Sequence, residues 1–389
     1  MKIKQIQITN VGGIDDLVLD FEDRMNIISG PNGIGKTTIL ESVAHAFAGY
    51  ESNLLKRRAN SELGFVKTLV DQGNGEVRES SYQVAEFSPR KHEVTNPIEN
   101  YINNLISLKV ARTFNYVALD AVSRDSDRDK YNTATSNKSG VNLTEVKGWF
   151  VNRYLYSAHP GALSDVRIHN FQKAKNFFSL LNNEYEFSRV DAGTNEIMVN
   201  TPTGEIYYEY LSSGFKSCLS ILFGIAKEIE LRFANPGVKI DEFEGIILID
   251  ELELHLHPEW QSKISSILTQ AFPSVQFITT THSPHIIQTA MPNQVVALHS
   301  LNGKIERKSL PSTLYGYQGW TVEEVLTDVM GLSDTRTHVY KEAVQSFQSA
   351  IDEEDYESGV LAFEELKKLL HPENNIRKLL SFQLGAIKG

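Results

Sequence analysis

The sequence has little cysteine and no long apolar run. Cys218 is the single cysteine among 389 residues, which excludes a disulfide framework and a cysteine-based zinc site. No apolar stretch reaches the length of about 18 residues that a membrane span needs, so we expect none. The start of the chain, Met1–Ile8, alternates polar and apolar side chains and lacks the apolar core of a signal peptide. These absences favour a cytoplasmic protein.

Positive charge is also scarce. The chain carries 38 Lys and Arg against 49 Asp and Glu, a net charge of −11. This balance argues against a uniformly basic nucleic-acid binder, although it allows a local basic patch. Lys56–Arg58 is such a patch, and a solvated helix end is its alternative interpretation. The length allows one large α/β domain with an accessory element, or two domains.

A glycine-rich turn separates a predicted strand from a predicted helix. The apolar run Met25–Ile28 precedes it, and helical spacing of apolar residues predicts a helix from Lys36 to Phe47. The segment Gly30–Thr38 fits G-x-x-x-x-G-K-[ST], whose backbone N–H groups cradle phosphates. Lys36 should reach the β- and γ-phosphates of ATP, and the Thr37 hydroxyl should bind Mg²⁺. The predicted ATP-binding residues are Asn32, Gly33, Gly35, Lys36, Thr37 and Thr38.

Two adjacent carboxylates end a second predicted strand. Gly245–Glu251 contains four consecutive apolar residues followed by Asp250 and Glu251. Asp250 is predicted to hold Mg²⁺ together with Thr37. Glu251 is predicted to orient and deprotonate the attacking water. The alternative is a surface turn that carries two acids.

Two more motifs surround the acidic strand. Leu211, Ser212, Ser213 and Gly214 open a predicted helix at 213–232 and resemble the signature motif of ABC-type ATPases. That resemblance implies that their N–H groups bind the γ-phosphate of ATP held by a second subunit. A simple helix cap is the alternative. His282 follows a predicted strand at 275–280 and is a candidate catalytic residue that contacts phosphate and water. The alternatives are a core histidine, or a metal ligand with His255, His257 and His285.

Together, these four motifs resemble the ABC-type ATPase heads of the SMC, RecF and OLD group over residues 1–310. The resemblance implies an α/β fold with a P-loop NTPase head, and a homodimer or higher homo-oligomer that sandwiches ATP and Mg²⁺. Glu251–Pro258 and Thr281–Pro284 look most like OLD-type heads. The signature departs from the family pattern at Ser213 and Phe215, where a glycine and a glutamine are commoner.

The domain organisation is predicted from changes in pattern along the chain. Residues 1–89 and 186–310 should form the ATPase head. Residues 90–185 should form an inserted, mainly helical lobe, with helices near 97–108, 144–154 and 168–184 and an exposed polar loop at 123–142. Gln83 is a candidate for the glutamine of the Q-loop. Residues 311–389 should form a small helical module, a candidate partner dock, with helices near 321–331, 336–352, 355–370 and 373–385.

The C-terminal part bears on the biological role. Residues 311–389 are too few for the Toprim nuclease domain of OLD nucleases, so we expect no nuclease activity in this chain. Tyr315–Leu326 resembles a segment of stand-alone ATPases, and the chain resembles the ATPase subunit of Septu-type anti-phage defence. That resemblance implies a separately encoded HNH nuclease partner, held inactive until infection.

Two other functions stay open from the sequence. One is a RecF-like repair ATPase that binds DNA directly through a basic surface of the 90–185 arm. Salt-dependent duplex binding by the isolated protein would favour it. The other is a regulatory scaffold that binds ATP and hydrolyses it poorly. Glu251 argues against the scaffold.

Overall fold

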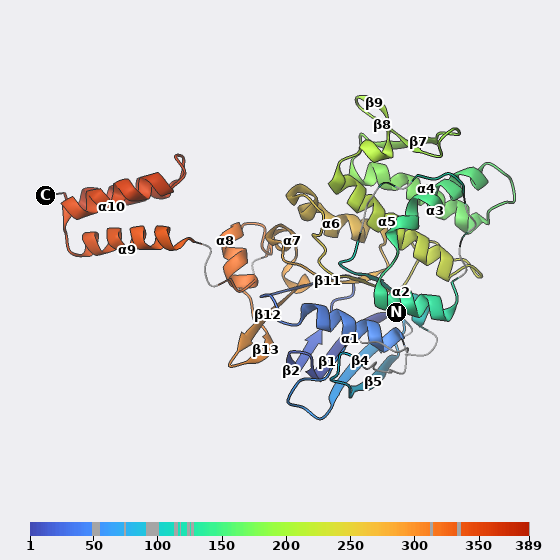
Figure 1. The fold of residues 1–389 in the computed structure, drawn as a ribbon, viewed down its shortest axis with the longest axis horizontal. Helices are drawn as coiled ribbons and strands as arrows, with labels where there is room; N and C mark the ends of the chain where they lie inside the picture. The colour runs from blue at the N-terminus through green and yellow to red at the C-terminus, as the bar shows by residue number, and fades with distance from the viewer. Residues whose placement is uncertain are drawn as a thin grey trace. The chain divides into compact units, whose positions relative to one another are not determined.

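A computed structural model of the chain describes residues 1–48, 55–73, 75–90, 101–112, 116, 118–122, 125, 128–311, 314–332 and 336–388. The chain forms two compact units, Met1–Gly331 and Leu332–Gly389 (Figure 1). The boundary lies later than the predicted one at 310. Val325, Val329 and Met330 are buried in the main core of the first unit, so this segment belongs to the head.

A six-stranded sheet forms the centre of the first unit. In spatial order, its strands are β13 (Lys304–Arg307), β12 (Val295–Leu301), β3 (Met25–Ser29), β11 (Gln276–Thr280), β10 (Ile246–Ile249) and β6 (Leu105–Leu108). All neighbours pair in parallel except β13, which is antiparallel to β12. Every residue of β3, β6, β10 and β11 is buried, as parallel strands covered on both faces require.

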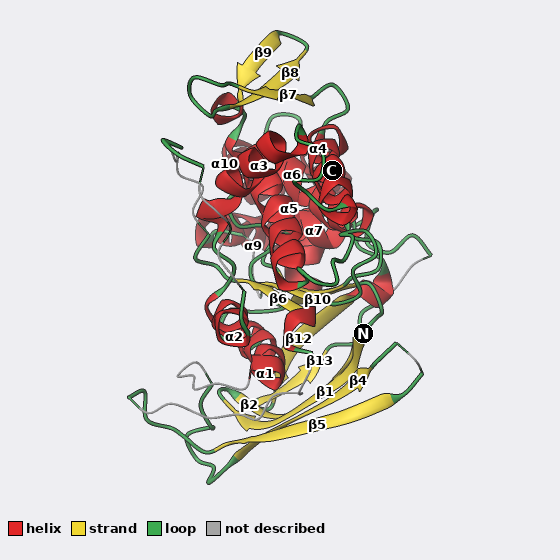
Figure 2. Cartoon of the chain, turned by 90° about the vertical axis from the view of Figure 1, so that its right-hand side faces the viewer, coloured by secondary structure: helices red, strands yellow, loops and turns green. Residues whose placement is uncertain are grey.

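A second sheet lies on one side of the first, and a helix separates the two. It is antiparallel, in the order β2 (Ile14–Asp20), β1 (Lys2–Val11), β4 (Gly64–Asp71), β5 (Val77–Val84). Helix α1 (Lys36–Ala48) contacts strands of both sheets, and Figure 2 shows it between them. Alternating buried positions in β1, β2 and β4 pack against its apolar side. The turn that precedes α1 is thereby held between two rigid layers.

Helices and a small sheet cover the other face (Figure 2). Helix α5 (Ser213–Arg232) is buried on nearly its whole surface and packs against α3, α4 and α6. Aromatic side chains fill this layer, with Phe150 in edge contact with Phe171 at a centroid distance of 5.2 Å. The remaining elements here are α3 (Val146–Ser157), α4 (Asp165–Leu181), α6 (Pro258–Ala271), α7 (Pro284–Gln288), β7 (Glu186–Val190), β8 (Ile197–Thr201) and β9 (Gly204–Tyr207).

Two predicted elements of the 90–185 region are wrong. The helix near 97–108 is instead β6, because Leu105–Leu108 pairs with β10 inside the main sheet. Residues 97–100 lie outside the described residues. The predicted loop at 123–142 contains helix α2 (Lys130–Ser139), capped by Asp129, whose side chain accepts from the Asn132 N–H. Since this region supplies a strand of the central sheet, it is not a separate lobe.

The remaining elements are helical and close to the prediction. Residues 321–331 form the short helix α8 (Val322–Glu324) and a π-helical turn, Val325–Val329. The second unit contains α9 (His338–Asp352), α10 (Tyr356–Leu369) and α11 (Ile376–Ala386). Its own small core includes Phe347 and Leu366. Over the described residues, no helix is long and apolar enough to cross a membrane.

Candidate active site

The predicted motifs meet at one edge of the central sheet. Parallel strands present their carboxyl ends at the same edge, where ligands bind in open α/β sheets. The Gly30 turn follows β3, Asp250 follows β10 and His282 follows β11. A fourth segment, Lys109–Arg112, follows β6 at this edge. The site is assembled from the residues just beyond these strands.

Glycine is required in the turn between β3 and α1. Gly30 has a φ of +149°, and a Cβ there would lie 2.6 Å from the Leu298 carbonyl oxygen. Gly35 has a φ of +99°, which L side chains rarely adopt. The predicted turn is therefore formed, and it leads into the N-terminus of α1, where unpaired N–H groups favour anions.

Lys36 is held inside this turn. Its side chain is only 7% exposed, and Nζ donates to the carbonyl oxygens of Gly30 at 2.9 Å and Pro31 at 3.0 Å. An ammonium has three N–H donors, so one remains for a ligand. Burial lowers the pKa of Lys36, and Glu253, Asp250 and Glu251 act against that shift.

Thr37 and Asp250 form a pair of oxygen ligands. The Thr37 hydroxyl donates to Asp250 Oδ2 at 3.1 Å, and the Thr280 hydroxyl donates to Asp250 Oδ1 at 2.6 Å. Asp250 is 3% exposed. Hydroxyl and carboxylate oxygens are the hard ligands that Mg²⁺ takes beside nucleotide phosphates. Thr37 and Asp250 fit a magnesium ion, as the sequence predicts.

The backbone of Glu251 is fixed on both sides. Its N–H donates to Thr280 Oγ1 at 2.8 Å, and its carbonyl accepts from Arg112 Nη2. Its φ of +49° is uncommon for a residue with a side chain. Strained backbone of this kind clusters at functional sites. The structure thus orients the half-buried Glu251 side chain through its main chain.

A third carboxylate, Glu253, organises the segment after β11 and was missed in the sequence. Its Oε2 accepts from the Thr281 hydroxyl at 2.7 Å, and its Oε1 accepts from the backbone N–H of His282 at 2.6 Å. His282 itself is exposed, so it is not a core histidine. A signal was present in the sequence, since Glu251 and Glu253 flank the apolar Leu252.

The predicted signature opens α5 as a capped turn. Ser212 Oγ accepts from the Phe215 N–H at 3.3 Å, and both Ser212 and Ser213 are exposed, whereas Leu211 and Gly214 are buried. Over the described ranges, no hydrogen bond or ion pair connects this turn to residues 30–38 of its own chain. The two serines are accessible to another molecule.

Packing explains two residues of this turn. A Cβ on Gly214 would lie 2.5 Å from Trp260 Cδ1. Phe215 meets the Trp260 ring edge-on at a centroid distance of 5.5 Å. The departure at Phe215 fills the space between α5 and α6, a contribution to the core.

The segment after β6 brings two more cations to the site. Lys109 Nζ pairs with Glu41 of α1, and burial raises the pKa of Glu41 against the pull of Lys109. Arg112 is 3% exposed. Gln83, the Q-loop candidate, lies instead in β5, exposed and opposite Phe65, so that prediction is wrong. Arg112 was missed in the sequence because Leu105–Leu108 was predicted to be helical, and only a strand there places Arg112 at the edge of the sheet.

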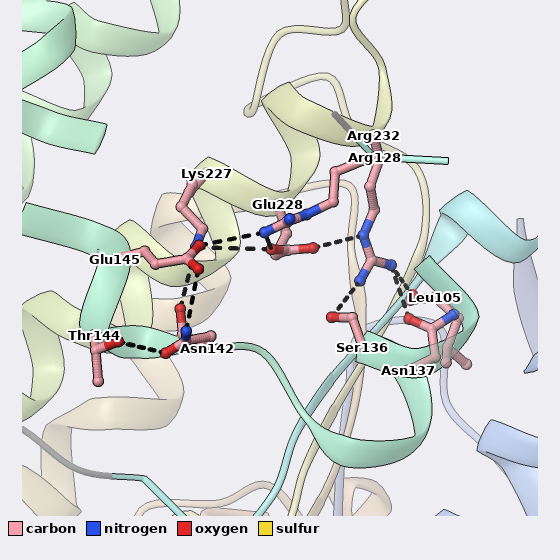
Figure 3. A network of polar contacts seen from close by, with 10 residues as sticks. All are labelled: Leu105, Arg128, Ser136, Asn137, Asn142, Thr144, Glu145, Lys227, Glu228 and Arg232. Atoms are coloured by element: carbon pink, nitrogen blue, oxygen red, sulfur yellow. Dashed lines mark hydrogen bonds and ion pairs between the residues drawn. The ribbon is translucent and has the colours of Figure 1, made fainter. Parts of the chain in front are cut away.

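A buried ionic network anchors the C-terminal half of α5 (Figure 3). Arg232 Nε pairs with Glu228 at 2.9 Å, and Arg128 Nη2 reaches the same carboxylate at 3.0 Å. Lys227 pairs with Glu145 at 2.8 Å. Burial alone would raise the pKa of Glu228, but its cations hold that pKa below its usual value. The network is electrostatically complete within the chain.

Arg232 also connects α5 to the active-site strand. Its Nη1 donates to the Leu105 carbonyl oxygen and to Asn137 Oδ1, as Figure 3 shows. Leu105 begins β6, which ends beside Lys109 and the candidate site. Helix α5 and this strand are therefore fixed to each other. In the part of the chain that the structure describes, no three His, Cys, Asp or Glu residues cluster as a metal site.

Comparison with known proteins identifies the family. A family profile described as "AAA domain, putative AbiEii toxin, Type IV TA system" matches residues 25–288. Septu protein PtuA of Bacillus thuringiensis is 40% identical over 395 residues, which cover 98% of each chain. The chain belongs to the Septu PtuA family. This confirms the resemblance to Septu-type ATPases that the motifs and Tyr315–Leu326 indicated.

Two more distant similarities were also found. The retron Ec83 probable ATPase of Escherichia coli is 23% identical over 455 residues, covering 92% of this chain and 81% of that protein. The SMC head domain of Thermotoga maritima aligns with a TM-score of 0.44 at 14% identity, covering 80% of this chain and 100% of that one. The parallel sheet with helices on its faces confirms the predicted α/β fold.

Proposed function

We propose that this chain binds Mg²⁺ and ATP at the turn before α1, hydrolyses ATP as a dimer, and thereby controls a separately encoded nuclease in anti-phage defence. The observation that carries the ATPase function is the meeting of Thr37, Asp250 and Glu251 at the edge of the central sheet where β3 and β10 end. Hydroxyl and carboxylate suit the metal, which when bound neutralises phosphate charge. A second carboxylate beside them suits the attacking water.

Each residue of the site has a distinct task in this proposal. Lys36 gives its remaining N–H to the β- and γ-phosphates, while Gly30 and Pro31 keep its ammonium in place. Glu251 accepts a proton from the attacking water. Glu253 positions His282, whose exposed imidazole then reaches the γ-phosphate.

A second copy of the chain completes the site. The exposed Ser212 and Ser213 and the free N–H groups of the α5 N-terminus suit a γ-phosphate. No described contact directs them to their own P-loop. We therefore expect a homodimer, or a higher homo-oligomer, that closes on two ATP molecules and opens after slow hydrolysis.

The nuclease partner follows from the family. Septu protein PtuA of Bacillus thuringiensis matches this chain over nearly its full length, and the Septu resemblance implies an HNH endonuclease encoded beside the ATPase. The helices of the second unit carry exposed apolar residues such as Leu379 and Phe382, which suit a protein partner. We expect no nuclease activity from this chain alone.

Replacing the proposed base tests the ATPase function. Glu251→Gln should keep ATP binding and lower turnover by about 10²–10⁴-fold, the usual contribution of a general base. Glu259→Gln is the matched control, because Glu259 is an exposed acid on α6 paired only with Lys263; its turnover should equal that of the native chain. Unchanged turnover in Glu251→Gln would refute the assignment of the base.

Mixing two inactive variants tests the shared site. Lys36→Ala removes the phosphate ligand, and Ser213→Arg obstructs the surface offered to the second copy. Each variant alone should be inactive. A mixed dimer retains one intact site, formed by the native P-loop of one chain and the native signature of the other. Turnover should reappear on mixing, and its failure to do so would contradict the shared site.

A RecF-like DNA-binding role is the second candidate, and the cations of residues 90–185 argue against it. Arg128, Lys147 and Arg153, which could have formed a basic surface, pair with carboxylates inside the fold. A pull-down of the tagged chain from its native host with ATP present separates the two functions. A stoichiometric nuclease supports the defence role, whereas DNA without a protein partner supports the repair role.

A further inference from the structure

The turn after β6 connects all parts of the candidate site, yet none of the assigned motifs includes it. At the start of the strand, the Leu105 carbonyl accepts from Arg232 of the signature helix. At its end, Lys109 pairs with Glu41 of the P-loop helix. Beyond it, Arg112 donates to the carbonyl of Glu251. One strand thus joins α1, α5 and the segment that carries the proposed base.

Arg112 is a buried cation whose donors are mostly unused. Of its donor nitrogens, only Nη2 has a partner, the Glu251 carbonyl, while Nε and Nη1 have none among the described residues. A guanidinium carries five N–H donors, and a buried donor without a partner costs free energy. Such a group is retained where a ligand supplies the missing acceptors.

The surroundings of Arg112 indicate which ligand that is. The carboxylates of Asp250, Glu251 and Glu253 raise the pKa of Arg112 and also that of Lys36. Both cations therefore lie near the same three carboxylates. Burial lowers the pKa of Arg112 to about 10, and the guanidinium stays charged at neutral pH. No described carboxylate pairs with it directly. A polyanion with Mg²⁺ balances this arrangement of two cations and three acids.

We propose that Arg112 binds the γ-phosphate of ATP in its own chain, as a second phosphate ligand beside Lys36. The fork of a guanidinium can contact two phosphate oxygens at once. Arg112 also donates a hydrogen bond to the backbone carbonyl of Glu251. The same side chain therefore couples binding of the γ-phosphate to the position of the proposed base. The fixed strand β6 then transmits its position to α5 through Arg232. This inference rests on the proposed ATPase function.

The affinity ratio for ATP and ADP tests this role. Both affinities are measured by calorimetry with Mg²⁺ in the full chain carrying Glu251→Gln, which prevents turnover. Adding Arg112→Met should weaken ATP binding by about 10–100-fold, the value of a charged hydrogen bond. ADP binding should change by less than about threefold, because ADP lacks the γ-phosphate. Arg112→Lys keeps the charge, and should lose less ATP affinity.

A buried arginine elsewhere provides the matched control. Arg153 on α3 is 1% exposed and pairs with Glu230 and Asp125, so Arg153→Met removes a buried guanidinium without approaching the site. Its ATP-to-ADP ratio should stay at the parent value. Equal losses of ATP and ADP in Arg112→Met and Arg112→Lys would overturn the proposal, since a merely structural residue gives that result. A parent chain that binds neither nucleotide would refute the proposed ATPase function itself.

Discussion

Two buried clusters of charge in this chain are built in opposite ways. In the nucleotide cluster, defined as Lys36, Arg112, Asp250, Glu251 and Glu253, no cation lies within 4.0 Å of a carboxylate among the described residues. Its cations donate to backbone carbonyls, and its carboxylates accept from hydroxyl and backbone groups. The cluster holds opposite charges close together without pairing them.

The network at the end of α5 does the reverse. Each of its cations pairs with a carboxylate, Arg232 and Arg128 with Glu228 and Lys227 with Glu145. Unpaired buried charge is costly. A paired network is therefore complete in the folded chain, whereas the charges of the nucleotide cluster form no ion pairs with one another among the described residues, as the proposed binding of Mg²⁺ and phosphates requires. The contrast separates charges that are paired within the fold from charges that we propose to bind a ligand.

The largest effect expected is on turnover in the nucleotide cluster. Asp250→Asn removes a metal ligand and should lower ATP turnover by more than about 100-fold, since metal stabilisation is worth several kcal/mol. The free energy of unfolding of the nucleotide-free chain should change by less than about 1 kcal/mol, because no cation loses its partner. Turnover assays and urea unfolding measure the two quantities. A large loss of stability would break the distinction between the clusters.

The α5 network should respond in the opposite sense. Arg232→Met leaves Glu228 short of a partner in the core and should lower the free energy of unfolding by about 3–5 kcal/mol, measured by urea titration. Arg232→Met with Glu228→Leu removes both charges and should recover part of that loss. A loss below about 1 kcal/mol in the single variant would mean that the remaining cations, Arg128 and Lys227, compensate.

A buried histidine extends the comparison to pH. His45 of α1 is fully buried, and burial with Lys138, Lys109 and Lys56 lowers its pKa from 6.5 to about 3. Below pH 6.5, His45 therefore binds a proton in the unfolded chain but not in the folded chain. The free energy of unfolding falls as the pH decreases. The loss at pH 5 is about 2 kcal/mol. His45→Phe cannot take the proton and should show a flatter stability profile between pH 7 and 5.

The carboxylate of Glu228 does not interfere in that window. The pKa of Glu228 is held below its usual value by its cations, so its stabilising contribution is present above pH 4.5 and is lost only at lower pH. Unfolding by urea at a series of pH values separates the two groups. An equal slope in the native chain and His45→Phe would show that His45 is already neutral in the unfolded chain or accessible in the folded one.

The elements with strong local signals could be read from the sequence. Helix α5 spans Ser213–Arg232, as predicted, because a serine cap marks where it begins. The turn before Lys36 and the Asp250–Glu251 pair were also found, since their chemistry depends on neighbours in sequence. These residues could be predicted because their roles depend on nearby residues in the sequence.

The residues that were missed depend on distant partners. Leu105–Leu108 is a strand because β10 pairs with it, and α2 receives hydrogen bonds from Arg232 at Ser136 and Asn137. Arg112 and Glu253 join the site only because two strand ends meet. No periodicity within either segment encodes that meeting. Tertiary contacts decided these assignments, as they often override local propensity.

The smallest effect expected sharpens what the comparison means. Lys67 of β4 and Glu79 of β5 form an ion pair at 2.7 Å, as short as the pairs of the α5 network. Both side chains are exposed, at 43% and 52%, and water solvates each charge when it is alone. Lys67→Gln should change the free energy of unfolding by only about 0.2–0.5 kcal/mol, a difference that high salt should abolish. Equal distances with a tenfold difference in free energy would show that burial, rather than proximity, determines which charges the fold depends on.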